Sequence, residues 1–461
     1  MTKIDRKIET KSKLFHDIAI RVVKLANIIA MTIPFAIAWY SSYADLLWVK
    51  FSMRGHWLVI ALFVIVYCII GKIYDAFRMS YYSKVQMAYS QILSLFEVNI
   101  VMYIVAWLLI RYIPRALPLL IAFGCQIIIA ILWSRLSQNW YFYTFPAFRT
   151  VVIWDRRKGI SGLIDEYNLN IKYKVVSEVF VEDCIADLSI LNGADTVFMI
   201  GINSHDRDII ANYCVMHDIK SFIVPNVGDL IMAGAKRSHM FHLLVLKVER
   251  FNPSLEYMVA KRIGDIFLSI LAVILFSPIM VIAAICIKLE DGGPVIYKQC
   301  RLTKDGKEFD IYKFRSMRTD AEKDGIARLS TGDNDDRMTK VGRIIRKYRI
   351  DEMPQLFNIL KGDLSIVGPR AERPEIAREY QKELPEFELR LQAKAGLTGY
   401  AQVYGKYNTT PYDKLLMDLM YLAKASVWED LRIIFATVKI LFLQESTEGI
   451  EEGKTTAMGD R

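Results

Sequence analysis

The sequence predicts a multi-domain membrane protein with three parts. These are an N-terminal four-helix transmembrane bundle, an α/β middle domain, and a mixed α/β C-terminal domain with a re-entrant membrane helix. The chain has 461 residues, which is more than one compact domain usually holds. Hydrophobic residues make up 53% of it although 24% of its residues are charged, and this apolar excess is concentrated in five runs.

The charge and cysteine content exclude several classes of protein. Six cysteines in 461 residues exclude a disulfide scaffold, and their wide spacing excludes zinc-ligand pairs. With 24% charged and 12% aromatic residues, the chain is not a disordered one. The net charge of +9 fits an anionic membrane surface, nucleic acid or a phosphorylated substrate, and composition does not choose among them.

Four apolar stretches within residues 1–147 predict the transmembrane bundle. Each can be extended to the roughly 20 residues that a helix needs to cross a bilayer. A buried bundle of a soluble protein is disfavoured because two of the stretches are apolar on every side, whereas such a bundle would show polar faces. The predicted helices cover about residues 18–40, 54–74, 90–110 and 117–135.

The first apolar stretch is predicted to remain in the protein as a membrane helix, and the charges that flank the bundle predict its orientation. A secretory signal peptide is rejected because no small-residue cleavage site follows Tyr40 and further apolar stretches come after it. The N-terminal tail and the segment after Trp133 are the most basic flanks of the bundle. Because basic flanks favour the cytoplasmic side, both ends of the bundle are predicted to be cytoplasmic.

Residues 148–250 predict an α/β middle domain with a Rossmann-like fold. Short β-rich runs alternate with helical stretches such as residues 207–217, which is the pattern of a parallel sheet with crossover helices. The turn after the first run contains Gly159 and Gly162 but lacks the G-x-G-x-x-G fingerprint of a dinucleotide site. We therefore expect a degenerate nucleotide-binding fold with a structural or regulatory role.

A fifth apolar run covers 22 residues, 266–287, and is long enough to cross a membrane. Ser277 and Pro278 lie at its middle, where a proline removes a helix hydrogen bond and kinks the axis. Basic residues flank both ends of the run, whereas a spanning helix normally shows a charge bias between its ends. We predict a re-entrant helix over residues 264–288 that breaks at this pair; a kinked spanning helix is the alternative.

The C-terminal domain, residues 255–461, contains the most informative cluster of charges. Residues 337–349 include six basic side chains and no acid, and helical spacing places Lys340, Arg343 and Arg346 on one face.

Two carboxylates, Asp351 and Glu352, follow this basic run at the start of a helix that is predicted to end at Gly362. The positive end of a helix favours ionised carboxylates. An ionised Asp beside guanidinium groups suits phosphoryl transfer, because the carboxylate can act as a nucleophile while cations neutralise the transferring group. A second carboxylate suits Mg²⁺. Helix capping is the alternative role of such a pair, and the neighbouring basic run and membrane segment favour chemistry.

The stretch from Lys261 to about Gly449 resembles the catalytic domain of bacterial polyprenyl-phosphate sugar-1-phosphate transferases, the monotopic phosphoglycosyl transferase superfamily. Eight motifs in order carry the resemblance over about 190 residues. They are Lys261-Arg-x-x-Asp265, Ser277-Pro278, Lys313-Phe-Arg-Ser-Met317, Asp351-Glu-x-Pro-Gln355, Leu360-Lys-Gly-Asp363, Val367-Gly-Pro-Arg370, Gly396-Leu-Thr-Gly-Tyr-Ala-Gln402 and Glu445-Ser-Thr-Glu-Gly449. The four spans and the middle domain resemble the large members of this family.

The resemblance implies a ping-pong reaction. Asp351 would attack the β-phosphorus of a UDP-sugar, releasing UMP and leaving a sugar-phosphate on the carboxylate. Undecaprenyl phosphate would then take the sugar-phosphate. Glu352 would hold Mg²⁺, and Arg346 would lie close to the aspartate. The implied substrate-binding residues are Pro369, Arg370, Arg301, Lys313, Arg315 and Arg343.

The resemblance also implies a cellular role and a set of partners. The reaction would be the first membrane step of exopolysaccharide, capsule or O-antigen synthesis, on the cytoplasmic face of the bacterial cytoplasmic membrane. UDP-glucose or UDP-galactose is the expected donor from family habit, and no nucleic-acid partner is expected. The sequence does not determine the oligomeric state, for which a homodimer is one option.

Three positions depart from the family pattern. Arg349 stands where the family usually has a small hydroxyl residue, Ala395 stands where it has proline, and Ala371 stands where proline is frequent. None of these changes removes a group with an implied catalytic role. Arg349, however, lies in the loop that leads to Asp351 and is expected to alter that loop.

Two other function classes remain as alternatives. A membrane-anchored nucleotide-sugar epimerase or dehydratase would need a glycine-rich turn and a Tyr-x-x-x-Lys pair. The only such pair is Tyr257 and Lys261, which lies outside any predicted Rossmann core. A non-enzymatic membrane scaffold is disfavoured because both carboxylates are present.

Overall fold

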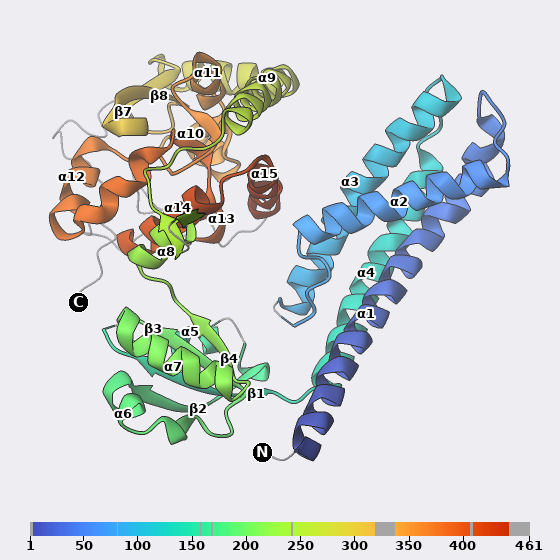
Figure 1. Cartoon of the computed structure of the whole chain (residues 1–461). Coiled ribbons are helices and arrows are strands. Elements are labelled where there is room, and N and C mark those ends of the chain that lie inside the picture. Colours follow the sequence, from blue (N-terminus) through green and yellow to red (C-terminus); the bar gives the residue numbers. More distant parts are fainter. Residues whose placement is uncertain are drawn as a thin grey trace. The chain divides into compact units, whose positions relative to one another are not determined.

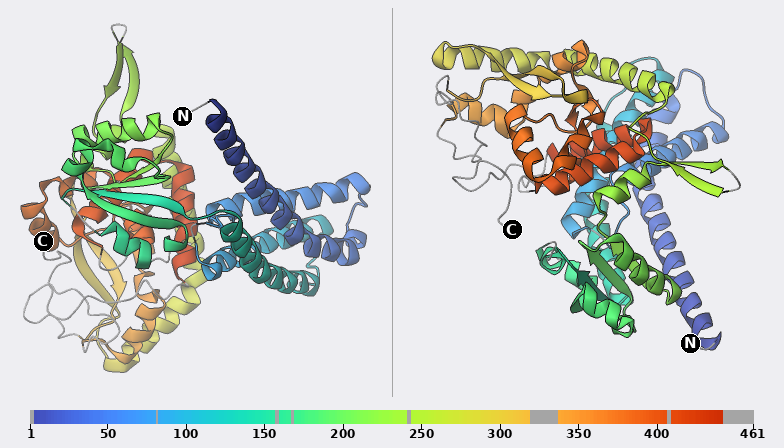
Figure 2. Two further views of the ribbon diagram at one scale, coloured as in Figure 1. Left: turned by 90° about the horizontal axis from the view of Figure 1, so that it is seen from below. Right: turned by 60° about the vertical axis from the view of Figure 1, so that its left-hand side comes forward.

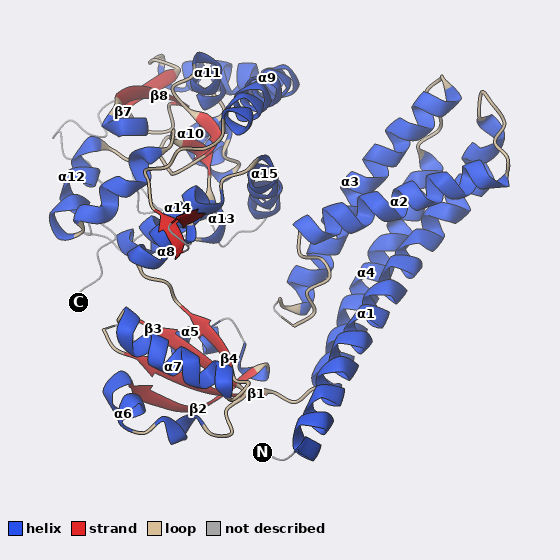
Figure 3. Ribbon diagram, viewed as in Figure 1, coloured by secondary structure: helices blue, strands red, loops and turns tan. Residues whose placement is uncertain are grey.

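The structure, a computed structural model, forms two compact units, Met1–Val224 and Pro225–Arg461 (Figure 1). The first unit contains long helices and a parallel sheet, and the second is a mixed α/β unit (Figure 3). The described residues are 3–80, 82–156, 159–166, 169–240, 243–318, 337–405 and 409–441.

Four long apolar helices begin the first unit, one at each predicted stretch. Helix α1 packs against α2 and α4, and α3 packs against α2 and α4. All four are long and apolar enough to cross a membrane, which indicates membrane association. Their bounds are α1 (Lys3–Ala38), α2 (Met53–Ile73), α3 (Lys84–Ile110) and α4 (Leu117–Thr144), with the short turns η1 (Trp39–Tyr43) and η2 (Ala44–Leu46) after α1.

Three of these helices extend beyond the apolar stretches that predicted them. Helix α3 begins at Lys84, six residues before the predicted start at 90, because Ser83 and Gln86 form a capping box there. Helix α1 begins earlier and α4 ends later than predicted. The apolar run marks only the part of a helix that suits a lipid environment, and both helices continue beyond it into more polar sequence.

The sheet of the first unit is parallel, as the alternation of β-rich and helical stretches predicted. Its strand order is β2-β1-β3-β4. Side chains of β1 alternate between two cores: Val151 and Ile153 pack with residues of α6 and α7, and Val152 packs with Ile160 and Ile164 of α5. Helices therefore cover both faces. The bounds are β1 (Phe148–Trp154), α5 (Ile160–Glu166), η3 (Leu169–Ile171), β2 (Tyr173–Phe180), α6 (Val181–Ala186), η4 (Leu188–Leu191), β3 (Thr196–Ile200), α7 (Ser204–Met216) and β4 (Lys220–Ile223).

The second unit begins at Pro225, before the predicted end of the middle domain at residue 250. Leu230 of its first helix is buried in one core with Tyr380, Leu415 and Leu419, and this packing accounts for the earlier boundary. The hairpin of β5 and β6 extends away from the other elements of this unit (Figure 2). The first elements are α8 (Val227–Ala233), β5 (Lys236–Met240), β6 (Leu243–Lys247) and α9 (Leu255–Asp291).

Two more strand pairs and several helices complete the second unit. Strands β7 and β8 pair antiparallel, and β9 and β10 pair parallel. The elements are β7 (Ile296–Leu302), η5 (Lys304–Gly306), β8 (Glu308–Phe314), α10 (Lys340–Lys347), η6 (Ile350–Glu352), α11 (Gln355–Lys361), β9 (Ser365–Val367), α12 (Pro374–Glu383), η7 (Pro385–Gln392), β10 (Gly396–Thr398), α13 (Tyr400–Tyr404), α14 (Pro411–Lys424) and α15 (Val427–Leu441).

Helix α9 is continuous over 37 residues, so the predicted break into two helices at Ser277 and Pro278 is wrong. Pro278 has no N–H to donate to the carbonyl of Ile274, four residues earlier. The Ser277 hydroxyl donates to that same carbonyl at 2.9 Å. This side-chain hydrogen bond satisfies the acceptor that proline leaves unpaired, and the helix continues.

Both halves of α9 pack against other elements of the second unit. In the first half, the buried Asp265 carboxylate accepts from Ser365 Oγ at 2.7 Å and from Ile366 N at 3.1 Å. In the second half, Ala283 and Ile287 are buried in a core with Phe314 and Ile345. The two ends of the helix are therefore attached to one compact unit.

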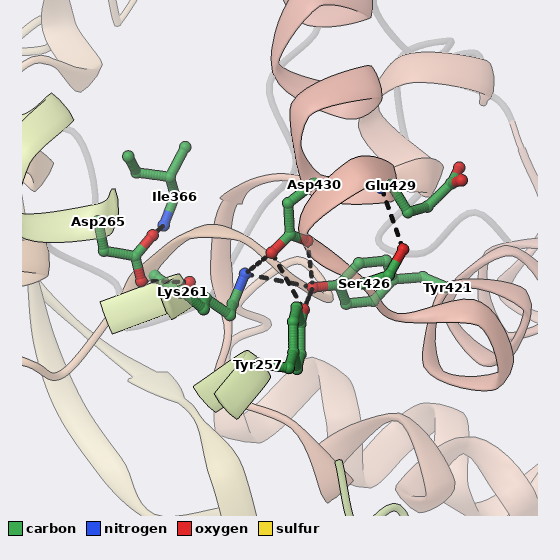
Figure 4. A network of polar contacts seen from close by, with 9 residues as sticks. Tyr257, Lys261, Asp265, Ile366, Tyr421, Ser426, Glu429 and Asp430 are labelled. Atoms are coloured by element: carbon green, nitrogen blue, oxygen red, sulfur yellow. Dashed lines mark hydrogen bonds and ion pairs between the residues drawn. The ribbon is translucent and has the colours of Figure 1, made fainter. Parts of the chain in front are cut away.

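The beginning of α9 is fixed by a polar network (Figure 4). Lys261 Nζ lies 2.8 Å from Asp430 Oδ2, and the Tyr257 hydroxyl donates to the same oxygen at 3.0 Å. The hydroxyl of Tyr421 donates to the other oxygen of this carboxylate at 2.8 Å. Tyr257 and Lys261, the Tyr-x-x-x-Lys pair of the epimerase alternative, thus join α9 to α14 and α15.

Candidate active site

The acidic pair lies in the short turn η6, between α10 and α11. Thr339 caps the start of α10 by accepting from Gly342 N at 2.9 Å. After α10, Arg349 adopts a left-handed conformation with φ +54°, which redirects the chain so that Asp351 is buried. Helix α11 then runs to Gly362, whose φ of +101° ends it as predicted.

Glu352 is surrounded by cations. Its Oε1 lies 2.9 Å from Lys313 Nζ on β8, and its Oε2 lies 4.0 Å from the Arg349 guanidinium. Burial acts to raise the pKa of Glu352, but the charges of Lys313, Arg370 and Arg349 outweigh it and hold the pKa well below its usual range. Glu352 is therefore ionised at neutral pH.

The pKa of Asp351 shifts in the opposite direction from that of Glu352, although the two side chains have nearly the same neighbours. Its side chain is only 8% exposed, and burial raises the pKa of Asp351 to about 6. The adjacent Glu352 charge also raises this pKa, while Lys313, Arg346 and Arg349 lower it, and the value of about 6 is the net result. Two neighbouring carboxylates thus have pKa values shifted in opposite directions, an arrangement typical of active sites.

The position of Lys313 is set by a bridge between β8 and α11. The buried Asn358 side chain accepts from Tyr312 N at 2.9 Å and donates to the carbonyl of Asp310 at 2.8 Å. These two bonds hold the strand against the helix that follows the acidic pair. Lys313, the next residue along the strand, is thereby brought to Glu352.

An open cleft lies beside Glu352. Three cationic side chains and one carboxylate face it, together with two glutamines and several apolar residues. Such a set can bind a phosphorylated ligand. The lining residues are Arg301, Ile311, Lys313, Glu352, Gln355, Arg370, Ala371, Gly396, Leu397 and Gln402.

The turn that carries Arg370 is held tightly. Gly396 N donates to the carbonyl of Pro369 at 2.9 Å. A Cβ atom at Gly368 would lie 2.4 Å from the carbonyl oxygen of Lys394, so only glycine fits this close approach. Beneath the turn, the buried Arg390 donates to the carbonyl of Arg370 at 2.9 Å and pairs with Asp418 at 2.7 Å.

Of the sequence-predicted residues, the structure brings Glu352, Lys313, Arg370 and Arg301 to the cleft. Burial lowers the pKa of Arg301 to about 10, which leaves this side chain charged at neutral pH.

The other predicted site residues lie beside or outside the cleft. Arg346 is close enough for its charge to lower the pKa of Asp351, and Pro369 is buried behind Arg370. Arg315 is buried and pairs with Asp291 at the end of α9, and Arg343 is exposed on α10; neither lines the cleft. Ser277 and Pro278 lie within α9.

The prediction of site residues missed Arg349, Gln355 and Gln402. Arg349 was flagged only as a departure from the family pattern, yet its charge lowers the pKa of both carboxylates. Gln355 and Gln402 each end a motif that carried the resemblance, and that position was the one signal that could have identified them.

Comparison with known proteins identifies the family. Residues 256–444 match the family described as Bacterial sugar transferase. The chain is 40% identical over 190 residues to the Exopolysaccharide production protein PSS of Rhizobium leguminosarum bv. phaseoli, a match that covers 39% of this chain and 94% of that protein. This chain belongs to the bacterial sugar transferase family.

Two further relatives carry more specific names. The chain is 38% identical over 209 residues to the UDP-glucose:undecaprenyl-phosphate glucose-1-phosphate transferase of Caulobacter vibrioides, which covers 44% of this chain and 78% of that protein. It is 36% identical over 231 residues to a UDP-N-acetylgalactosamine-undecaprenyl-phosphate N-acetylgalactosaminephosphotransferase of Aeromonas hydrophila. That match covers 50% of this chain and spans about half, 53%, of the relative's length.

The ion pair between Lys313 and Glu352 predicts a measurable contribution to stability. Lys313→Met should lower the free energy of unfolding at pH 7.5 by about 1 kcal/mol, because it leaves a mostly buried carboxylate without its nearest cation. Chemical denaturation of the detergent-solubilised protein would measure this. In a Glu352→Gln background the same substitution should have a smaller effect. Equal losses in both backgrounds would show that the pair is not coupled.

Proposed function

We propose that this protein transfers a sugar-1-phosphate from a UDP-sugar to undecaprenyl phosphate and releases UMP. The observation that supports this proposal best is the pair of buried Asp351 and partly buried Glu352 beside a cationic cleft, in a chain of the bacterial sugar transferase family. The names of two of these relatives, from Aeromonas hydrophila and Caulobacter vibrioides, specify a UDP-sugar and undecaprenyl phosphate. UDP-glucose or UDP-galactose is the proposed donor, and the reaction would begin exopolysaccharide, capsule or O-antigen synthesis.

In the proposed mechanism Asp351 is the nucleophile. Its carboxylate oxygen bonds to the β-phosphorus of the UDP-sugar, and the bond from that phosphorus to the bridging oxygen breaks. UMP leaves with the bridging oxygen and its electron pair. An oxygen of undecaprenyl phosphate then attacks the same phosphorus and returns Asp351 to its free carboxylate. Two such steps replace one direct transfer between two anions.

The neighbouring side chains have electrostatic roles in this proposal. Lys313, Arg370 and Arg301 line the cleft and would offset the charge of the diphosphate, and Arg346 would keep Asp351 ionised as the substrate arrives. Among the residues that the structure describes, no group of three or more His, Cys, Asp or Glu side chains is placed to bind a metal ion. Mg²⁺ that keeps its waters and binds substrate phosphates needs only one or two carboxylates, so Glu352 fits such an ion. When bound, the ion would neutralise phosphate charge.

We also propose that α9, bent at Pro278 rather than broken there, dips into the membrane from the cytoplasmic face and returns to it, while α1 to α4 cross the membrane. Large apolar side chains on the outer face of α9 are exposed, including Phe267, Ile274, Leu275 and Ile282. The opposite face packs on the second unit near both ends of the helix. A straight crossing would pull a polar unit into the bilayer, which is strongly unfavourable. The second unit would then lie on the cytoplasmic face.

The covalent step can be tested without the lipid. Enzyme and UDP-sugar alone should release up to one UMP per active site and leave an acyl phosphate that hydroxylamine cleaves. Asp351→Asn keeps the shape of the side chain but removes the anion, so we expect no adduct and essentially no turnover. Glu352→Gln should still form the adduct, more slowly. Release of UMP only after undecaprenyl phosphate is added would instead support direct transfer.

The pKa of Asp351 predicts an acid limb in the rate of UMP release. Because the nucleophile must be ionised, the rate should fall as the pH is lowered through about 6. Arg349→Ser removes a cation that lowers this pKa, so the limb should move to higher pH. Glu352→Gln removes the charge that raises it, so the limb should move to lower pH. If neither substitution moves the limb, another group controls it.

The orientation of α9 can be tested by labelling. Cysteines placed one at a time at Glu256 and Leu289, near the two ends of α9, should both resist a membrane-impermeant maleimide applied to spheroplasts. Val49→Cys, in the turn between α1 and α2, should react and serves as the positive control. Reaction at Leu289→Cys with protection at Glu256→Cys would mean that α9 crosses the membrane.

A further inference from the structure

The amide of Gln402 is the unexplained polar group of the cleft. Gln402 lies on α13 and lines the cleft with Lys313, Glu352 and Arg370. Its Oε1 and Nε2 atoms are both buried, and neither has a hydrogen-bond partner among the described residues. A buried amide without partners destabilises the free protein, so a role in binding would account for its presence.

The backbone around Gln402 leaves room for this orientation of the amide. A Cβ atom at Gly399 would lie 2.9 Å from Gln402 Oε1 and 2.2 Å from the carbonyl oxygen of Gly368. Any larger residue at this position would therefore displace the amide or the turn that leads to Arg370. The same glycine thus allows both the phosphate-binding turn and the amide beside it.

A second amide lies on the wall of the same cleft. Gln355, the first residue of α11, is 3% exposed and follows the acidic pair by three positions. The apolar side chains of Ile311, Ala371 and Leu397 complete the lining. The cleft therefore has two kinds of polar group, charged groups at Lys313 and Arg370 and neutral amides at the two glutamines.

The chemistry of an amide indicates which part of a substrate it would contact. A phosphate oxygen can accept from Nε2 but leaves Oε1 unpaired and repelled. A neutral group with an acceptor next to a donor satisfies both atoms of the amide. A UDP-sugar offers this chemistry twice, at the imide edge of uracil and at neighbouring hydroxyls of the hexose.

We infer that Gln402, assisted by Gln355, selects the donor substrate by hydrogen-bonding a neutral donor–acceptor group of the nucleotide sugar. This inference rests on the proposed function. It assigns the cationic side chains to the diphosphate and the amides to the part of the substrate that distinguishes one nucleotide sugar from another. A site built to pair such a group discriminates strongly against ligands that leave the amide unpaired.

Gln402→Met tests the inference, because methionine matches the length of glutamine and removes both hydrogen-bonding atoms without adding charge. The KM for the UDP-sugar should rise about tenfold or more. The thermal midpoint in detergent should stay the same or rise, because the lost amide has no partner in the free protein. Gln381→Met on α12, which does not line this cleft, is the matched control and should leave the KM unchanged.

Two further measurements identify the group that the amide contacts. If Gln402 pairs with uracil, inhibition by UMP should weaken in parallel with the rise in KM. If it pairs with the hexose, inhibition by UMP should be unchanged and the preference between UDP-glucose and UDP-galactose should diminish. Either result supports the inference.

Two results would overturn it. In the first, Gln402→Met keeps KM, UMP inhibition and sugar preference within about twofold of the wild type. In the second, the thermal midpoint falls and only kcat declines, which indicates a structural role. A wild-type protein that releases no UMP from any UDP-sugar with undecaprenyl phosphate would instead refute the proposed function itself.

Discussion

The placement of two adjacent carboxylates, Asp351 buried and Glu352 partly buried, is the constraint on which the second unit depends. Asp351 and Glu352 are neighbours in the chain, and both carboxylates cannot stay ionised in a buried turn unless cations surround them. Lys313 and Arg349 supply two of these charges at 2.9 Å and 4.0 Å from Glu352. The elements that carry the cations must therefore meet at this turn.

Hydrogen bonds to backbone atoms hold those elements in place. Asn358 joins β8 to α11 through two backbone hydrogen bonds and so fixes Lys313. The pairing of β9 with β10 holds the turn of Arg370, and Arg390 supports that turn from below. These supports bond to backbone atoms, so they do not occupy the charged ends of Lys313 and Arg370.

Sequence reasoning identified the parts of this arrangement that are local in the chain. The acidic pair, Lys313 and Arg370 stand in short motifs, and the alternation of β-rich and helical stretches predicted the parallel sheet. Arg315 could not be placed, because its partner Asp291 is distant in sequence and only the fold brings them together. Gln402 was missed for a similar reason: an amide has no charge to mark it, and its lack of partners is a property of packing.

The packing of α9 connects membrane attachment to the chemistry of the cleft. Asp265 binds β9 directly, through Ser365 and Ile366, and β9 leads into the turn of Arg370. The other end of the helix packs on Phe314, the residue that follows Lys313. The helix with the exposed apolar face is thus attached to both elements that bring cations to Glu352. In the proposed function the lipid phosphate has its charge at the membrane surface, so a cleft held at a constant distance from the exposed apolar face of α9 would meet that phosphate without leaving the surface.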